Sequence, residues 1–319
     1  MPAAKPLLCI VTPGTRIANN GNWRTAARWA LMLRDRYRVI VQTAWDGRRC
    51  DAMIALHARH SAQSITRFHE ETGSRHLAVV LTGTDLYRDL PASLEARASL
   101  DAAGRIVVLQ DEARRALEPR WRRKALVIYQ SAEHIPRGRN TGPGILCLAV
   151  GHLRDEKDPR TLFAAIDRLP AKLAIRIRHI GEALDPALGA EATALAAREP
   201  RYTFVGALPR ARTRLAIARA SVLVHPSRME GGANVIVEAV VSATPVIASA
   251  IPGNVGMLGR EYPGYFRVGD ASDLAARLVQ ACEDQSYLAA LARACTARRP
   301  LFAPSAEARA IRALAKSLL

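Results

Sequence analysis

Residues 230–238 of this chain read Glu-Gly-Gly-Ala-Asn-Val-Ile-Val-Glu, a pair of carboxylates around a glycine turn. The apolar stretch 221–225 before it predicts a strand that runs into a loop. The residues after it predict a helix and then a strand at 244–248. In open α/β sheets, ligands bind at the carboxyl ends of strands, where helix N-termini present free N–H groups to anions. We therefore expect Glu230 on a loop that faces such a crevice. Glu238, inside the helix, is placed to accept hydrogen bonds from sugar or ribose hydroxyls. A simpler alternative is an acidic first turn that complements the helix dipole.

A second glycine-containing loop carries cations. Residues 150–159 (Val-Gly-His-Leu-Arg-Asp-Glu-Lys-Asp-Pro) follow a predicted strand at 145–150 and precede a predicted helix. Arg154 and Lys157 on this loop suit a diphosphate clamp, because they combine a planar guanidinium with a point charge. The alternative is an ordinary solvated loop with charges. Both loops leave strand ends of one predicted sheet, so we expect them to converge.

Strand and helix patterns alternate twice along the 319 residues, which favours two domains. The short, continuous apolar runs are typical of parallel strands that are buried on both faces. They lie at 7–11, 39–43, 53–56, 77–81, 106–109 and 126–128, and then at 145–150, 173–180, 202–205, 222–224 and 246–248. The clearest helical patterns lie at 23–36, 61–71, 111–117 and 305–318.

A linker separates the two alternations. Residues 131–144 contain two prolines and three glycines, which marks them as a connecting segment. The predicted fold class is α/β, with two Rossmann-like doubly wound domains that face each other across a cleft. We expect an N-terminal acceptor-side domain at 1–138, with the C-terminal helix 304–319 packed back on it. The C-terminal domain at 139–303 is expected to bind the donor.

Composition limits the cellular setting. The five cysteines form no CxxC or CxxH pair, so they indicate reduced core residues of a cytoplasmic protein. The start of the chain runs into a strand without a signal-peptide pattern, and no window is long and apolar enough to cross a bilayer. The sequence thus predicts no stable membrane insertion.

The net charge of +17 first suggests nucleic acid as a partner. However, the arginines are scattered through nearly every predicted helix, and aromatic residues make up only 5% of the chain. We therefore expect small anionic substrates and no nucleic acid.

Three segments of the first half are candidates for ligand binding. The loop 13–22 is long and rich in glycine and amides, and Gly21 and Asn22 at the helix start are placed to meet an anion or a donor sugar. The segment 57–61 (His-Ala-Arg-His-Ser) presents a strand-end histidine that suits hydrogen bonding or acid–base work. The segment 82–85 (Thr-Gly-Thr-Asp) offers two hydroxyls and a carboxylate. A plain helix cap is the alternative for both Asn22 and Asp85.

A metal site is not expected, because the two histidines of 57–61 have no clear third ligand in the sequence.

The carboxylate pair Glu230 and Glu238, together with Arg154, Lys157 and the strand 244–248, resembles the retaining nucleotide-sugar glycosyltransferases of the GT-B fold, in particular those like family 4. The resemblance implies that Glu230 holds the donor-sugar hydroxyls and Glu238 the ribose hydroxyls. Arg154, Lys157 and backbone N–H groups would stabilise the departing diphosphate, with neither a metal nor a cofactor. The catalytic residues implied are His57, Arg154, Lys157 and Glu230, and the donor-binding residues are Gly14, Gly151, Gly231, Gly232, Ala233, Asn234, Val235 and Glu238.

Within that family, the segments 21–25, 57–61 and 82–87 are together similar to the selenosugar synthases of selenoneine biosynthesis. This similarity implies selenophosphate as acceptor and a UDP-hexose as donor, UDP-N-acetylglucosamine or UDP-glucose, giving a selenosugar, UDP and phosphate. The acceptor-binding residues implied are Asn20, Gly21, Asn22, His60, Ser61, Thr82, Gly83, Thr84 and Asp85. The chain departs from the family where Gly232, Ala233 and Asn234 replace an aromatic, a glycine and an aliphatic residue, which widens the pocket.

Other functions stay open at this point. An ordinary GT-B glycosyltransferase with a carbohydrate or lipid acceptor is the nearest alternative, and a basic α/β protein that binds nucleic acid is another. A dinucleotide oxidoreductase is disfavoured, because no GxGxxG follows the first strand.

Overall fold

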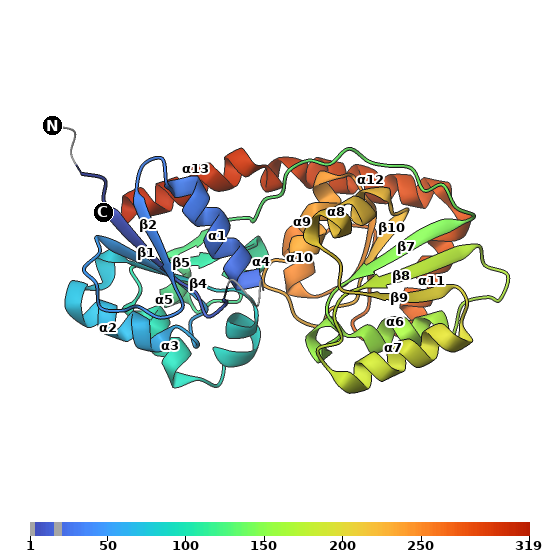
Figure 1. Cartoon of the computed structure of the whole chain (residues 1–319), viewed down its shortest axis with the longest axis horizontal. Coiled ribbons are helices and arrows are strands. Elements are labelled where there is room, and N and C mark those ends of the chain that lie inside the picture. The colour runs from blue at the N-terminus through green and yellow to red at the C-terminus, as the bar shows by residue number, and fades with distance from the viewer. Residues whose placement is uncertain (1–3, 16–20) are drawn as a thin grey trace. The chain divides into compact units, whose positions relative to one another are not determined.

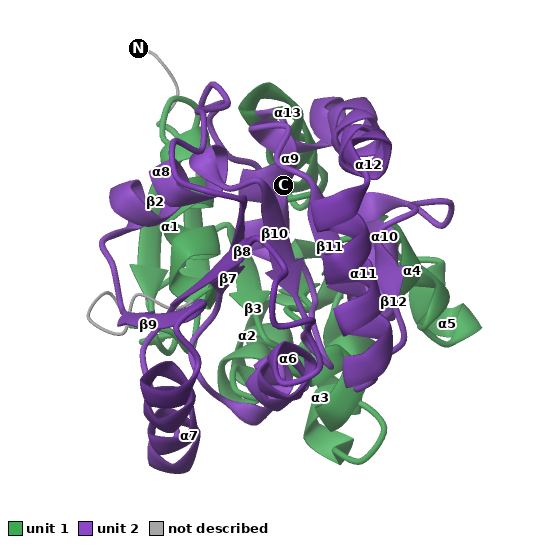
Figure 2. Ribbon diagram, turned by 90° about the vertical axis from the view of Figure 1, so that its right-hand side faces the viewer, with its two compact units in different colours: residues 1–130, 304–319 green, residues 131–303 purple. Residues whose placement is uncertain are grey.

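The computed structural model describes residues 4–15 and 21–319 and divides the chain into two compact units (Figures 1 and 2). Unit 1 consists of residues 1–130 and 304–319, and unit 2 of residues 131–303. Each unit holds one six-stranded sheet in which every recorded strand pair is parallel. The α/β fold class with two Rossmann-like units is therefore confirmed.

Unit 1 orders its strands β2-β1-β3-β4-β5-β6. Its strands are β1 (Leu7–Val11), β2 (Arg38–Gln42), β3 (Ala52–Leu56), β4 (Leu77–Val80), β5 (Arg105–Val108) and β6 (Ala125–Val127). Its α-helices are α1 (Gly21–Leu33), α2 (Ala62–Thr72), α3 (Leu94–Ala102), α4 (Asp111–Arg115), α5 (Pro119–Arg122) and α13 (Pro304–Ser317). Two short elements complete it, the 3₁₀ turn η1 (Ser74–His76) and the π-helical turn η2 (Asp85–Asp89).

The sheet of unit 1 is buried on both faces, which explains its continuous apolar strands. Consecutive residues of β3 belong to two separate core clusters on opposite faces of the sheet, for example Met53 to one and Ile54 to the other. The second cluster includes Trp29 of α1 and Ile311 and Leu314 of α13. Burying these apolar side chains against the sheet supplies the driving force that returns the last helix to unit 1.

A buried carboxylate also fixes α13 in unit 1. Glu307 is 1% exposed and accepts hydrogen bonds from Arg28 Nε (2.8 Å) and from Trp29 Nε1 (2.7 Å). A second guanidinium nitrogen of Arg28 lies 3.0 Å from Glu307 Oε1, so the pair is bidentate. The helix thus combines apolar and charged contacts with α1.

Unit 2 orders its strands β12-β11-β10-β7-β8-β9. Its strands are β7 (Ile145–Val150), β8 (Ile175–Ile180), β9 (Tyr202–Gly206), β10 (Val222–His225), β11 (Val246–Ser249) and β12 (Tyr265–Phe266). Its α-helices are α6 (Pro159–Ile166), α7 (Pro186–Arg198), α8 (Arg210–Arg219), α9 (Asn234–Val241), α10 (Pro252–Leu258), α11 (Ala271–Glu283) and α12 (Gln285–Arg298). The 3₁₀ turns η3 (Asp155–Lys157) and η4 (Arg299–Phe302) are short.

The segment 131–144 has no regular secondary structure. Its first part belongs to unit 2, because the backbone N–H of Ala132 bonds to Phe302 O and that of Gly138 to Ala218 O. Unit 2 therefore begins at Ser131, a few residues before the boundary expected from the linker composition. No described helix is long and apolar enough to span a membrane.

Candidate functional site

The two sheets each reverse their strand order at one point. In unit 2 the chain runs from β7 outward to β8 and β9 and then returns to β10, on the other side of β7. In unit 1 the same reversal lies between β1 and β3. Such switch points leave a crevice outside the carboxyl ends of the flanking strands, where ligands of open α/β sheets bind. Most of the sequence-predicted site residues follow these strands, and residues 82–85 follow the neighbouring strand β4.

Lys157, Glu230 and His225 meet at the switch point of unit 2. Lys157 ends η3 after β7, His225 is the last residue of β10, and Glu230 lies on the loop that leads to α9. Lys157 Nζ lies 2.5 Å from Glu230 Oε1, and His225 Nε2 lies 3.0 Å from the same oxygen. The loops after β7 and β10 thus converge, as the sequence suggested.

The site holds Glu230 ionised. Burial alone raises the pKa of this carboxyl, but the Lys157 ammonium and the His225 hydrogen bond outweigh burial and keep the pKa well below its usual range. Burial lowers the pKa of His225, which favours the neutral ring. Because an ionised carboxylate only accepts, the ring proton of His225 lies on Nε2.

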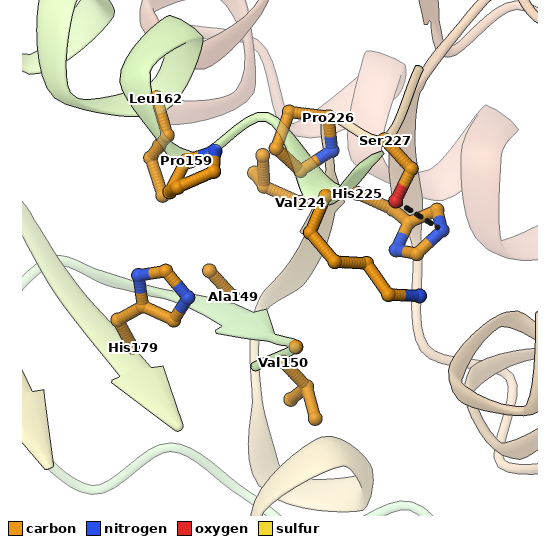
Figure 3. Close-up of a pocket in the computed structure, with 11 residues that line it drawn as sticks. Ala149, Val150, Pro159, Leu162, His179, Val224, His225, Pro226 and Ser227 are labelled. Atoms are coloured by element: carbon orange, nitrogen blue, oxygen red, sulfur yellow. Dashed lines mark hydrogen bonds between the residues drawn. The ribbon is translucent and has the colours of Figure 1, made fainter. Parts of the chain in front are cut away.

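A small cavity lies next to this cluster at the ends of β7 and β10 (Figure 3). Its lining residues are mostly apolar and include Ala149, Val150, Pro159, Leu162, Val224 and Pro226. Lys157 and His225 also line it. His179 lines the cavity too, but its Nδ1 bonds to Tyr202 Oη at 3.1 Å and its ring packs against Phe163 and Phe204.

The N-terminus of α9 has no side-chain cap. Its N-cap residue, Ala233, offers no side-chain hydrogen bond to the first turn. The backbone N–H of Ile236 is the first to bond back, to Ala233 O at 3.0 Å, so the preceding amides of Asn234 and Val235 lie at the helix end. Gly253 packs so closely that a Cβ there would come 2.2 Å from Glu230 O, which ties α10 to this loop.

Arg154 and Gly151 flank Lys157 in different ways. The Arg154 side chain is 46% exposed, and its Nε lies 3.8 Å from Glu156 Oε2. No recorded contact joins it to Glu230 within the described residues. A Cβ on Gly151 would meet the Lys157 side chain at 3.5 Å, so this glycine lies beside the aliphatic part of that lysine.

The Glu238 side chain is only 8% exposed and lies near two arginines of α8 that no motif in the sequence indicates. Arg210 Nε is 3.4 Å and Arg214 Nε 3.9 Å from Glu238 Oε1. A second pair that the sequence did not reveal is Arg228 with Asp158, at 2.9 Å. Since Arg228 also donates its backbone N–H to Glu156 O, this pair links the two converging loops.

His57 of unit 1 has a strained backbone and a defined ring tautomer. Its φ is 72°, which is rare for a residue with a side chain, and it follows β3 at the switch point. Its Nδ1 accepts the backbone N–H of His60 at 3.2 Å, and its Nε2 lies 3.1 Å from Thr84 Oγ1. Burial lowers the pKa of His57, although the nearby Asp85 opposes this shift. The ring is therefore neutral, with its proton on Nε2.

Asp85 organises the two loops of unit 1 rather than facing solvent. It is fully buried, and its Oδ2 accepts the backbone N–H of Ala58 at 3.0 Å. Its Oδ1 accepts the backbone N–H groups of Thr82 and Gly83, each at 2.8 Å. The carboxylate thus connects the loop after β3 to the loop after β4.

The other predicted residues of unit 1 differ in accessibility. Ser61 is buried and donates its hydroxyl to Leu56 O at 2.7 Å, so it is bound to the main chain. His60 is exposed, and Gly21 begins α1 with Asn22 beside it. The backbone N–H of Gly14 lies 3.4 Å from Thr12 Oγ1. Asn20 lies outside the described residues.

Three side chains bring possible metal-ligand atoms within 4.8 Å of one another, namely those of His57, His60 and Asp89. A possible third ligand therefore does accompany the two histidines. The donor set nevertheless does not fit a metal. Because His57 Nδ1 already accepts an N–H, its Nε2 carries a proton and offers no lone pair. Arg88 Nε and Arg59 also lie 3.3 and 3.5 Å from Asp89 Oδ1, and their charges oppose a cation.

Comparisons with known proteins agree with this architecture. Residues 144–284 match the model of the family described as glycosyl transferases group 1. No curated protein matches the chain.

Solved structures similar to the whole chain include HepE from Anabaena in complex with UDP and glucose. It has a TM-score of 0.76 at 16% identity and covers 98% of this chain and 100% of its own. Sucrose-phosphate synthase from Thermosynechococcus elongatus has a TM-score of 0.79 at 18% identity and covers 99% of both chains. A glycosyltransferase from Rickettsia africae has a TM-score of 0.71 at 12% identity and covers 98% of both. These likenesses establish the GT-B fold.

Proposed function

We propose that this protein, which has the GT-B fold, is a glycosyltransferase that takes its sugar from a UDP-sugar. One observation carries the proposal: Lys157 and Glu230 meet at the switch point of unit 2, at 2.5 Å, beside the uncapped end of α9. A sugar diphosphate needs a cation and free helix amides for its phosphates, and a carboxylate that accepts hydrogen bonds from the sugar hydroxyls. The match of residues 144–284 to a glycosyl transferase family supports the same assignment.

In the proposed donor complex, Glu230 accepts hydrogen bonds from the sugar hydroxyls, and Glu238 accepts hydrogen bonds from the ribose hydroxyls. The Lys157 ammonium has three donors, so it can keep Glu230 in place and still bind a diphosphate oxygen. Arg154, which is exposed, adds a second cation. The backbone around Gly231, Gly232, Ala233, Asn234 and Val235 supplies amides, and Gly14 and Gly151 allow close approach of the donor. HepE, which has the same fold, was solved with UDP-glucose bound.

For the acceptor we propose selenophosphate, received by unit 1. At the carboxyl ends of β3 and β4, the His57 Nε2–H donates to the Thr84 hydroxyl oxygen at 3.1 Å, which leaves the Thr84 O–H to donate to a ligand. Two arginines whose side chains are about half exposed, Arg59 at 50% and Arg88 at 51%, pair with the buried Asp89, whose Oδ2 lies 3.8 Å from His57 Nε2. Donors and cations at one strand-end cluster suit a small oxyanion better than an uncharged glycan. Gly21, Asn22, His60 and Thr82 are the further acceptor-side candidates.

The proposed reaction needs no strong base. The selenium of selenophosphate attacks the anomeric carbon of the sugar, a C–Se bond forms, and the C–O bond to UDP breaks, with the electron pair leaving on UDP. Water then cleaves the Se–P bond and releases phosphate and the selenosugar. Selenophosphate is already a strong nucleophile, so the protein contributes positioning and stabilisation of the leaving diphosphate.

The test is to incubate the purified protein with UDP-N-acetylglucosamine or UDP-glucose and selenophosphate, and to measure UDP release and a selenium-containing sugar. We expect both products. Controls replace selenophosphate with phosphate, thiophosphate or simple sugars. UDP release with a simple sugar but not with selenophosphate would support the alternative, an ordinary GT-B glycosyltransferase with a carbohydrate acceptor, and a lipid acceptor would be tested in the same way. No turnover of any UDP-sugar would contradict the donor assignment.

A further inference from the structure

His225 is a buried histidine beside the proposed donor site whose role the sequence pattern does not reveal. It is 1% exposed at the end of β10, and its Nε2 lies 3.0 Å from Glu230 Oε1. Ser227 Oγ lies 3.1 Å from the same nitrogen, which gives the ring a second polar neighbour (Figure 3). A buried ring with two polar contacts has little freedom to rotate.

The two oxygens of Glu230 are in different situations. Oε1 accepts from both Lys157 and His225. Oε2 has no hydrogen-bond partner among the described residues. It is also not fully buried, so solvent reaches it. The Glu230 side chain is 11% exposed. The exposed edge of this carboxylate is therefore Oε2.

We propose that His225 is a positioning residue for donor-sugar recognition: its Nε2–H holds Glu230 Oε1, so that Oε2 is directed to the hydroxyls of the sugar. This inference rests on the proposed function. Lys157 alone does not fix the carboxylate, because an ammonium is a point charge on a flexible stem and accepts many carboxylate orientations. The histidine adds a directional hydrogen bond from a rigid ring that is anchored in the sheet.

The position of the donor atom allows a stringent test with two similar amides. In His225→Gln the side-chain amide reaches the place of Nε2, whereas in His225→Asn it reaches only the place of Nδ1. His179→Leu is the matched control, since His179 is another buried histidine at the same cavity but bonds to Tyr202 and has no recorded contact with Glu230. Thermal unfolding establishes that each variant is folded.

The readout is calorimetric affinity for UDP-N-acetylglucosamine, UDP-glucose and UDP. For His225→Asn we expect affinity for the UDP-sugar to fall by about tenfold or more, which is the loss of one hydrogen bond to a charged group. UDP affinity should stay within about twofold, because UDP lacks the sugar that Glu230 holds. His225→Gln should restore most of the sugar-dependent affinity, and His179→Leu should bind both ligands like the wild type.

Three results would overturn the inference. Equal affinity of wild type and His225→Asn for the UDP-sugar shows that the His225 N–H is not required to position the Glu230 carboxylate. An equal loss of UDP and UDP-sugar affinity shows general damage to the unit. Failure of His225→Gln to exceed His225→Asn shows that the N–H position does not matter. In each case the wild type still binds the UDP-sugar, whereas failure of the wild type to do so would overturn the proposed function itself.

Discussion

The ring of His57 accepts a hydrogen bond at Nδ1 from the backbone N–H of His60, 3.2 Å away. This contact uses the lone pair that a general base or a metal ligand would need, and it leaves a proton on Nε2. With its proton on Nε2, the neutral His57 ring donates to Thr84 Oγ1 at 3.1 Å, and we predict that a bound acceptor also receives a hydrogen bond from this N–H. The sequence alone left acid–base work open for this residue.

This tautomer predicts how His57 variants behave. His57→Gln places an amide N–H where Nε2 lies and should keep acceptor affinity within about fivefold, whereas His57→Asn should lose about tenfold or more. The measurement is the KM for selenophosphate. A ¹⁵N spectrum of the wild-type ring should show the proton on Nε2. If His57→Asn and His57→Gln have the same KM, the donor role is wrong.

The ion pair of Glu230 and Lys157 predicts large losses of turnover. Glu230→Gln removes the carboxylate proposed for the sugar hydroxyls, and Lys157→Ala removes the cation proposed for the diphosphate. Each should lower kcat/KM by about two orders of magnitude, the scale of losing a preorganised charge stabiliser. Glu191→Gln is the control, because Glu191 pairs with Arg160 at 2.7 Å on the exposed surface. Near-full activity of both site variants would exclude their assignment.

His179 predicts a loss of stability in acid. Burial lowers the pKa of His179 to about 4, from an ordinary value of 6.5. The folded state therefore binds this proton less readily than the unfolded chain, so its contribution to stability is full above about pH 6.5 and declines as the pH falls toward 4. The whole contribution is about 3 kcal/mol. Denaturant unfolding between these pH values should show a flatter pH dependence in His179→Leu than in the wild type, and equal slopes would contradict the prediction.

Glu307 predicts a local effect on unit 1. Its replacement in Glu307→Ala leaves the Arg28 guanidinium and the Trp29 N–H without their partner, and should cost about 3 kcal/mol of unfolding free energy. UDP affinity should not change, because every donor-site residue that contacts the Lys157–Glu230 pair belongs to unit 2. Paired unfolding and UDP titration curves test both statements. A stable Glu307→Ala variant would mean that the apolar contacts of α13 suffice.

The strands were predictable because their signal, a short run of apolar residues, lies within a few consecutive positions of the sequence. Parallel strands buried on both faces are continuous apolar runs, and the predicted strands 7–11 and 145–150 agree residue for residue with β1 and β7. The contact of Lys157 with Glu230 followed from topology, since both loops leave neighbouring strands of one sheet.

Other features depend on contacts that no local pattern reveals. Arg210 and Glu238 are far apart in sequence and meet only because α8 and α9 pack together. His225 lies where the sequence predicts that the strand runs into a loop, and nothing in the apolar pattern indicates that its ring contacts Glu230. Asp85 has the sequence of a ligand-binding carboxylate or a cap, yet its oxygens are used by backbone amides of two loops. The binding roles of the site residues stay predictions.

The most direct test of the central claim is a calorimetric titration of UDP-N-acetylglucosamine and UDP-glucose into the wild type and into Glu230→Gln. The account predicts that the wild type binds at least one UDP-sugar more tightly than UDP, and that Glu230→Gln keeps UDP affinity but loses this sugar-dependent gain. A wild type that binds neither UDP-sugar, or a Glu230→Gln variant that retains the full gain, would contradict it.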